Sequence, residues 1–264
     1  MSFFKHLQEC SDQEALTLLE ARFKANTTFF NTHLPHLGEL LAQKTKTFHL
    51  YLDTHGLNIK SNTGEFIYPI IDNKSTIYSA SQALTLNLGS SATSELFFNQ
   101  TGVTDYHVPT LPIICKTVNA INQHIRKDPN YTNESIYLTN EKMLPTLTMY
   151  GLLSGLQLEI LMHQYERMHA LFIYEPNVDF FILSAFFVDY AALYQKVEEN
   201  SCFIFVGGMV SDSAVKAFFS TRLITNNYYR LEVSCYNDKR FDDAKALFLK
   251  HQRANTRGWG TVDD

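Results

Sequence analysis

The chain has 264 residues, of which 45% are hydrophobic and 19% charged, and its formal net charge is −5 at pH 7. This amount of apolar side chain is enough for a sizeable core, whereas the acidic balance argues against nucleic-acid binding, which usually needs a concentrated basic surface. The most apolar run, residues 180–188, is about half as long as a membrane span, so we expect no membrane-spanning segment.

The four cysteines lie far apart in the sequence and form no C-x-x-C pair. The first residues, Met-Ser-Phe-Phe-Lys-His, lack the basic segment and apolar core of a secretion signal. Both features are typical of a reduced, intracellular protein, and we expect a cytoplasmic location.

The first part of the chain predicts a small α+β domain, which we place at residues 1–105. Ser11 and Glu14 form a capping box, a signal that begins a helix. The turn Thr54-His55-Gly56 separates two alternating segments and indicates a β-meander. In chain order we expect helices at 11–23 and 34–41, then strands at 48–53, 57–60 and 66–68. Residues 79–102 are rich in serine, threonine and asparagine and have weak periodicity, so they give no sharp boundary for this domain.

From residue 106 onward, apolar strand-like runs alternate with helical segments. The expected strands lie at 135–138, 146–150, 170–174, 202–206 and 229–235. The expected helices lie at 111–125, 155–165, 179–187, 190–198, 212–219 and 241–253. Near-continuous apolar strands separated by helices indicate a parallel sheet that is covered on both faces. We therefore expect an α/β fold in which residues 106–264 form a Rossmann-like three-layer domain with a mostly parallel sheet.

A glycine-containing loop follows the strand expected at 146–150. Gly151 and Gly155 open the next helix, where nucleotide-binding α/β domains place their phosphate loop. The following strand ends in Glu175-Pro176-Asn177, and an acidic residue at this point often binds a ribose. One hypothesis is therefore a nucleotide pocket with Gly151, Gly155, Glu175 and Asn177 as binding residues.

The same residues also have a structural interpretation. The spacing is G-x-x-x-G rather than G-x-G-x-x-G, and Leu152-Leu153 puts bulk where a pyrophosphate needs bare backbone. The glycines would then shape a tight strand-to-helix turn. Glu175 would cap the next helix or bridge to a neighbour.

A second strand-end loop, Gly207-Gly208, is expected at the same edge of the sheet, where the ligands of open α/β sheets gather. We include both glycines in the candidate binding site. Asp212 follows these glycines. It could belong to the site, or it could be an ordinary N-cap of the next helix.

No motif assigns a catalytic residue or a metal ligand. The sequence contains no H-E-x-x-H, no G-x-S-x-G, no Walker A pattern and no cysteine–histidine cluster with zinc spacing. We therefore leave the catalytic residues unassigned and expect no metal site.

The second half of the chain resembles one known family. The segment Tyr150-Gly-Leu-Leu-Ser-Gly-Leu, the strand ending in Glu175-Pro176-Asn177, and the closing Arg257-Gly-Trp-Gly260 look like the N-terminal region of motility accessory factors. Residues 29–53 resemble the first segment of that family more weakly.

The resemblance implies a cytoplasmic glycosyltransferase. Members of the family move pseudaminic or legionaminic acid from a cytidine-monophosphate-activated donor to serine or threonine hydroxyls of flagellin, on which motility depends. Flagellin is thus the implied partner, with self-association of the chain as a further possibility.

The family's catalytic central domain carries a Gly-Pro-Ser loop, and this sequence contains no Gly-Pro-Ser. Full members are also about twice as long, so we expect a fragment of a longer protein or a truncated reading frame that does not catalyse the transfer alone and holds no cofactor itself. Two alternatives stay open. One is a self-sufficient transferase that binds a nucleotide sugar or S-adenosylmethionine; the other is a structural assembly module without a ligand.

Overall fold

A computed structural model describes residues 3–91, 143–144, 146–197, 201–221 and 230–257. The helix expected at 111–125 and the strand expected at 135–138 lie outside these residues. None of the helices in the described ranges is long and apolar enough to cross a membrane.

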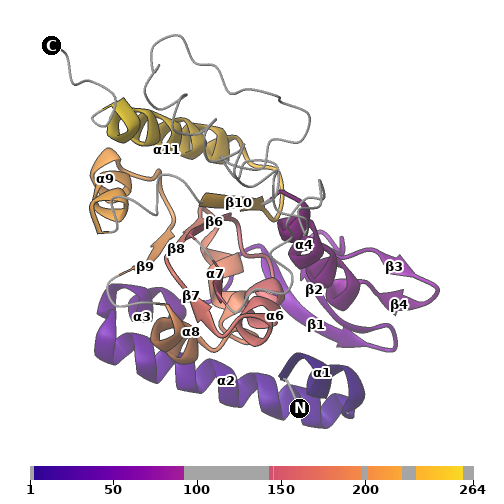
Figure 1. The fold of residues 1–264 in the computed structure, drawn as a ribbon. Coiled ribbons are helices and arrows are strands. Elements are labelled where there is room, and N and C mark those ends of the chain that lie inside the picture. The colour runs from indigo at the N-terminus through magenta and orange to yellow at the C-terminus, as the bar shows by residue number, and fades with distance from the viewer. Residues whose placement is uncertain (1–2, 92–142, 145, 198–200, 222–229, 258–264) are drawn as a thin grey trace, which may run out of the picture.

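The centre of the fold is a parallel sheet of four strands (Figure 1). Its members are β6 (Thr146–Tyr150), β8 (Leu171–Glu175), β9 (Cys202–Val206) and β10 (Arg230–Ser234). The strand order is β10-β6-β8-β9, and every neighbouring pair is parallel. The chain thus moves outward from β6 to β9 and then returns to the far side of β6. The direction of the order changes between β6 and β10, and ligands of open α/β sheets usually bind beyond the strand ends at such a point.

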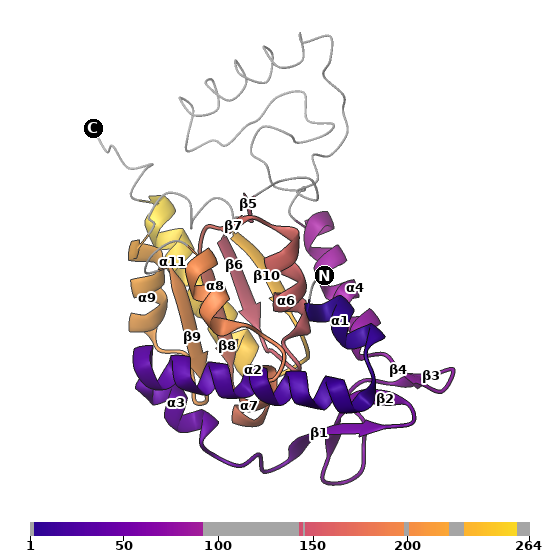
Figure 2. The same ribbon diagram turned by 90° about the horizontal axis from the view of Figure 1, so that it is seen from below.

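Helices cover both faces of this sheet, as Figure 2 shows from a second direction. One face carries α6 (Leu156–Gln164), α7 (Val178–Ser184) and α8 (Tyr190–Lys196); the other carries α9 (Asp212–Thr221) and α11 (Lys239–Arg257). Alternate residues of a strand point to opposite faces. In β8, Leu171 and Ile173 therefore join one hydrophobic cluster, and Phe172 and Tyr174 join the other. The expected three-layer Rossmann-like arrangement is confirmed.

The N-terminal segment begins with α1 (Phe3–Glu9), α2 (Asp12–His33) and α3 (Pro35–Leu41). The hydroxyl of Ser11 accepts a hydrogen bond from the backbone N–H of Glu14 at 3.4 Å, which confirms the expected helix start. The expected end at residue 23 is wrong, since α2 continues for ten more residues.

Asn26 explains part of this extension. Its side-chain nitrogen donates to the carbonyls of Ala185 and Val188 at 2.7 Å each, and its oxygen accepts from the N–H of Tyr190 at 3.1 Å. Phe30, one turn further along, is fully buried in the same cluster as the sheet residues. A stretch that is polar in sequence is therefore helical because of its tertiary contacts.

The next elements form two hairpins and a helix. Strands β1 (Phe48–Asp53) and β2 (Gly56–Ser61) are antiparallel, as expected, and Asp53 pairs with Gly56 at the turn. A short hairpin of β3 (Ile70–Ile71) and β4 (Lys74–Ser75) and the helix α4 (Ile77–Ser91) follow, and the sequence predicted neither. A further short parallel pair joins β5 (Met143–Leu144) to β7 (Arg167–Met168).

The third strand expected at 66–68 does not form; a single bridge joins Lys60 to Phe66. The side chain of the buried Asn58 donates to the carbonyl of Tyr68 at 2.8 Å and accepts from its N–H at 3.2 Å. A side chain thus takes the place of the backbone ladder at this position.

The hydrophobic clusters run across the two predicted domains. Phe30 and Leu37 pack in the cluster that contains Leu147 and Ile173, while Ile59 packs in the cluster that contains Phe180 of α7. The boundary near residue 105 stays a prediction. The described residues of the first range share hydrophobic cores with the parallel sheet.

The carboxylate of Asp179 anchors the segment before β1. It accepts hydrogen bonds from the backbone N–H groups of Lys46 (2.9 and 3.0 Å), Thr47 (2.6 Å) and Phe48 (3.0 Å). Hydrogen bonds to a charged acceptor are among the stronger ones in proteins. One side chain in the first turn of α7 therefore holds the first hairpin against the α/β body.

Asp179→Ala is expected to lower the free energy of unfolding by about 1–3 kcal/mol, because three backbone donors lose their acceptor. Asp179→Asn keeps one acceptor oxygen and is expected to lose less. Urea denaturation followed by circular dichroism measures both variants. Wild-type stability in both of them would show that water replaces the carboxylate without cost.

Candidate functional site

The loop between β6 and α6 has an unusual backbone. Gly151 (φ +87°), Leu153 (φ +52°) and Gly155 (φ +76°) all have positive φ, and Gly155 is the N-cap of α6. Leu153 is the one non-glycine residue of the three, and a left-handed backbone is costly for a residue with a side chain. Its side chain is nearly buried in a hydrophobic cluster, which provides the compensating contacts.

Gly151 is a point of close approach, and the approaching group is a tyrosine of the same chain. A Cβ atom at this position would lie 2.4 Å from Cε1 of Tyr236. In nucleotide-binding loops the bare backbone of such a glycine faces the phosphates. Here the ring of Tyr236, from the loop after β10, lies against it.

Gly155 is confined in a similar way. A Cβ atom there would lie 2.6 Å from Cγ2 of Val188 and 2.9 Å from Cβ of Ser184. The neighbouring Ser154 is fully buried, and its hydroxyl shares a 2.9 Å hydrogen bond with the hydroxyl of Tyr68. Neither residue of the loop presents a reactive group to solvent.

The carboxylate of Glu175 lies at the centre of the strand-end loops and has no exposed surface. One oxygen accepts from the backbone N–H of Leu152 at 2.6 Å. The other accepts from the N–H of Asn177 at 2.8 Å and from the hydroxyl of Tyr236 at 2.5 Å. Glu175 therefore joins the ends of β6, β8 and β10 through groups of the protein itself.

Burial raises the pKa of Glu175 to about 7 from its ordinary value of 4.5. The hydrogen bonds from Tyr236, Asn177 and Leu152 oppose this change, because they stabilise the charged form. Removal from water has the larger effect. The side chain consequently takes up a proton near neutral pH, which is rare for a glutamate.

The other candidate residues have local structural contacts. The side chain of Asn177 caps α7 by accepting from the N–H of Asp179 at 3.1 Å. The N–H of Gly207 donates to the carbonyl of Glu175 at 2.8 Å, and the carbonyl of Gly208 accepts from the hydroxyl of Tyr174 at 2.7 Å. The structure thus brings the strand-end candidates to one edge of the sheet. Their role in nucleotide binding stays a prediction.

Two residues of this edge were missed by sequence reasoning. Tyr236 bonds Glu175, and Arg240 donates to the carbonyl of Pro176 at 3.1 Å while it pairs with Asp238 at 2.6 Å. Both residues follow β10. Their position just beyond the carboxyl end of a parallel strand could have identified them as part of the candidate site.

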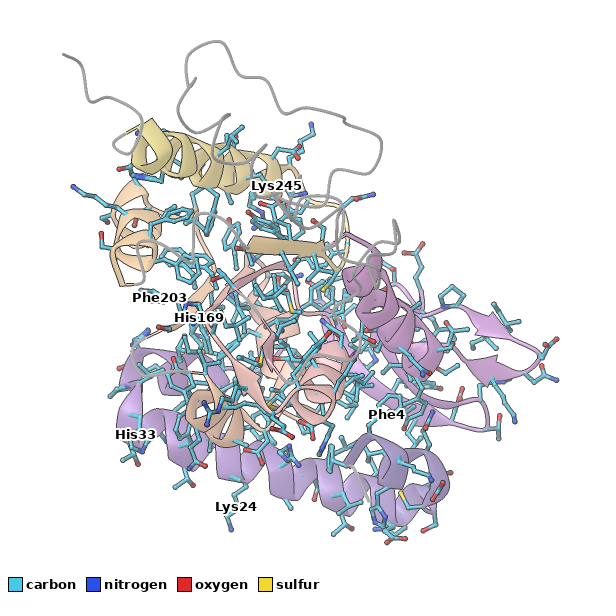
Figure 3. All side chains as sticks on the ribbon, viewed as in Figure 1. Phe4, Lys24, His33, His169, Phe203 and Lys245 are labelled. Atoms are coloured by element: carbon cyan, nitrogen blue, oxygen red, sulfur yellow. The ribbon has the colours of Figure 1, made fainter. Side chains whose placement is uncertain are left out.

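A small pocket of about 310 Å³ lies beside these residues, lined by Tyr236, Asn237 and the first turns of α11. Lys245 of α11 also lines this pocket (Figure 3), and its Nζ atom lies 5.2 Å from the ring centre of Tyr150. Over the residues that the structure describes, no group of three or more histidine, cysteine or carboxylate side chains could hold a metal ion. The hydroxyl–carboxylate pair of this edge, Tyr236 with Glu175, is turned toward the chain itself, because Glu175 has no exposed surface.

A parallel sheet with helices on both faces, and with its polar loops at the carboxyl ends of the strands, defines a Rossmann-like α/β protein. The chain belongs to the family described as the glycosyltransferase Maf N-terminal domain, whose sequence profile matches residues 22–251. No curated protein sequence matches it significantly.

Among solved structures, the fold is similar to that of a Maf glycosyltransferase from Magnetospirillum magneticum AMB-1. The TM-score is 0.53 at 17% sequence identity, over 91% of this chain. At this identity the likeness concerns the fold. The chain spans 35% of the length of that structure.

Proposed function

We propose that this chain is the N-terminal, non-catalytic part of a motility accessory factor, which glycosylates flagellin in the cytoplasm with pseudaminic or legionaminic acid. Family membership supports the link to glycosyl transfer. The sugar and the flagellin partner rest on the sequence resemblance alone. Catalysis and binding of the cytidine-monophosphate-activated donor are assigned to other parts of the full-length protein.

The non-catalytic role is supported by the burial of the candidate residues at the carboxyl ends of the strands, which we call the strand-end edge. A ribose-binding carboxylate must be reachable by a ligand, yet Glu175 has no exposed surface and its two oxygens accept three hydrogen bonds from the chain itself. The backbone of Gly151, which would face a pyrophosphate, is covered by the ring of Tyr236.

A self-sufficient nucleotide-sugar or S-adenosylmethionine-dependent transferase would need this edge to open. The Tyr236 hydroxyl would have to leave Glu175, and its ring would have to leave Gly151. A structural role needs no such movement. The residues that resemble a nucleotide loop instead connect the carboxyl ends of β6, β8 and β10. The domain then serves as a scaffold for flagellin or for the catalytic part.

The purified chain is expected to transfer no sugar from a cytidine-monophosphate-activated nonulosonic acid to flagellin. Its sequence contains no Gly-Pro-Ser loop, and among the residues that the structure describes the candidate binding residues Gly151 and Glu175 are covered by Tyr236. Mass spectrometry of intact flagellin after incubation measures the added sugar. A full-length motility accessory factor in a parallel reaction shows that donor and acceptor are competent. Glycosylated flagellin with this chain as the sole enzyme would contradict the proposal.

A further inference from the structure

A second pocket is separate from the strand-end residues, none of which line it. It has a volume of about 670 Å³ and lies between α1, α2, α6 and α8. Met162 and His163 from the end of α6, and Gln195 and Lys196 from the end of α8, are among its lining residues. Both helices run from the carboxyl ends of the strands toward their amino ends. The pocket therefore lies toward the amino ends of the strands.

Arg22 of α2 lies in the wall of this pocket and contacts three neighbouring side chains. Its Nη1 atom lies 3.5 Å from the carboxylate of Glu159 and 3.6 Å from that of Asp189. One face of the guanidinium stacks on the ring of Phe3, 4.0 Å from the ring centre. The side chain is 16% exposed. An arginine with these contacts has less conformational freedom to lose when it binds a ligand than a fully exposed one.

Only one corner of the guanidinium is used by these contacts. Within the part of the chain that the structure describes, the Nε and Nη2 atoms of Arg22 have no hydrogen-bond partner. These two N–H groups point in the same direction and form the side-on fork that binds a carboxylate or a phosphate through two parallel hydrogen bonds.

The nearby carboxylates are largely occupied. Glu159 is bonded by Arg22, by the N–H of Asp189 and by His163 (3.3 Å). Asp189 contacts Arg22 and accepts from the N–H of Ala192 at 2.9 Å, which caps α8. These contacts offset part of their negative charge, although the side chain of Asp189 is 40% exposed.

The remaining charged groups of the pocket are mixed. Lys196 donates to the carbonyl of Met162. Burial lowers the pKa of Lys196, while the charges of Glu159 and Glu166 act in the opposite direction. Glu166 is thus close to a cation. His6 and His163 add imidazole groups to the lining.

We propose that this pocket binds a small molecule that carries a carboxylate or a phosphate, with Nε and Nη2 of Arg22 as its main donors. The volume fits one or two sugar-sized rings. Phe3 and Met162 supply apolar surface for the uncharged part of the ligand. The site does not depend on the role proposed for the whole chain.

Three probes of equal ring size test the proposal: glucuronate, glucose 6-phosphate and glucose. Calorimetric titration at low ionic strength is expected to give saturable binding of one or both anions and none of glucose. The anion that binds identifies the ligand group as a carboxylate or a phosphate. Equal binding of glucose, or no binding of either anion, would overturn the proposal.

Two variants locate the binding. Ala192→Trp fills the pocket from an exposed helix position without removing an ionic group, and we expect at least a tenfold weaker Kd. Arg22→Lys keeps the charge but removes the fork and is expected to weaken binding as well. Ala246→Trp changes an exposed alanine of α11 outside the pocket and is the matched control. Unaltered binding in Ala192→Trp, with its melting curve equal to that of the control, would refute the assignment to this pocket.

Discussion

Gly155→Val is expected to lower the free energy of unfolding by about 2–6 kcal/mol. A side chain at φ +76° costs about 1–3 kcal/mol in backbone strain. Overpacking adds about 1–3 kcal/mol, because the new Cβ would lie 2.6 Å from Val188 and 2.9 Å from Ser184. Chemical denaturation of the two proteins side by side measures the difference.

Gly208→Val separates the two contributions. Gly208 also has a positive φ (+55°), but a Cβ atom there would meet no atom within 4 Å. This variant should therefore show the strain without the overlap and lose less stability than Gly155→Val. Equal losses would mean that the packing against α7 and the loop before α8 contributes nothing. An unchanged melting temperature in Gly155→Val would show that the loop can adopt another conformation.

Glu175 is expected to make the protein less stable as the pH rises from about 4.5 to about 7. The native state keeps the proton up to about pH 7, whereas the unfolded chain releases it near the ordinary value of 4.5. Between these values the native state binds more protons, so the free energy of unfolding falls with increasing pH. A difference of about 2.5 pKa units corresponds to about 3 kcal/mol.

The variant Glu175→Gln isolates this effect, because it keeps the shape of the side chain and cannot titrate. Burial also raises the pKa of Glu159, but that group titrates in both proteins and cancels in the comparison. Urea denaturation at pH 5 and pH 8 should show a larger loss of stability for the wild type than for Glu175→Gln. The same pH dependence in both proteins would mean that Glu175 is ionised at both pH 5 and pH 8, and that its hydrogen-bond donors compensate for its burial.

The parallel sheet could be predicted because its strands are continuous apolar runs. In β8, Leu171 and Phe172 are buried on opposite faces, so both must be apolar, and this pattern is visible without any tertiary information. The cap at Ser11 was equally local, since its partner is the N–H of Glu14 three residues later.

The errors lie where long-range contacts determine the local structure. Asn26 is polar in the sequence, yet its amide bonds three residues that are about 160 positions away, and it is buried within α2. The serine- and threonine-rich helix α4 gave no periodic signal. One of its polar residues, Ser81, is buried and donates to the carbonyl of Ile77 at 2.7 Å.

The candidate site shows the same limit. Gly151 and Glu175 were recognised from their positions at strand ends, and the structure brings their loops together. The partner that covers both of them, Tyr236, is 61 residues from Glu175 and belongs to no motif. Only the return of β10 to the far side of β6 brings it there.

The closed strand-end edge is tested most directly by nuclear magnetic resonance of the nitrogen-15-labelled chain. The backbone amides of Gly151, Leu152 and Asn177 would be followed during titration with cytidine monophosphate, S-adenosylmethionine and NAD. Changes confined to the amides of His163 and Ala192 would report the remote pocket instead. We predict that the three strand-end amides do not move with any of these ligands. Saturable shifts centred on them, lost in Glu175→Gln, would contradict the account and identify a working nucleotide site.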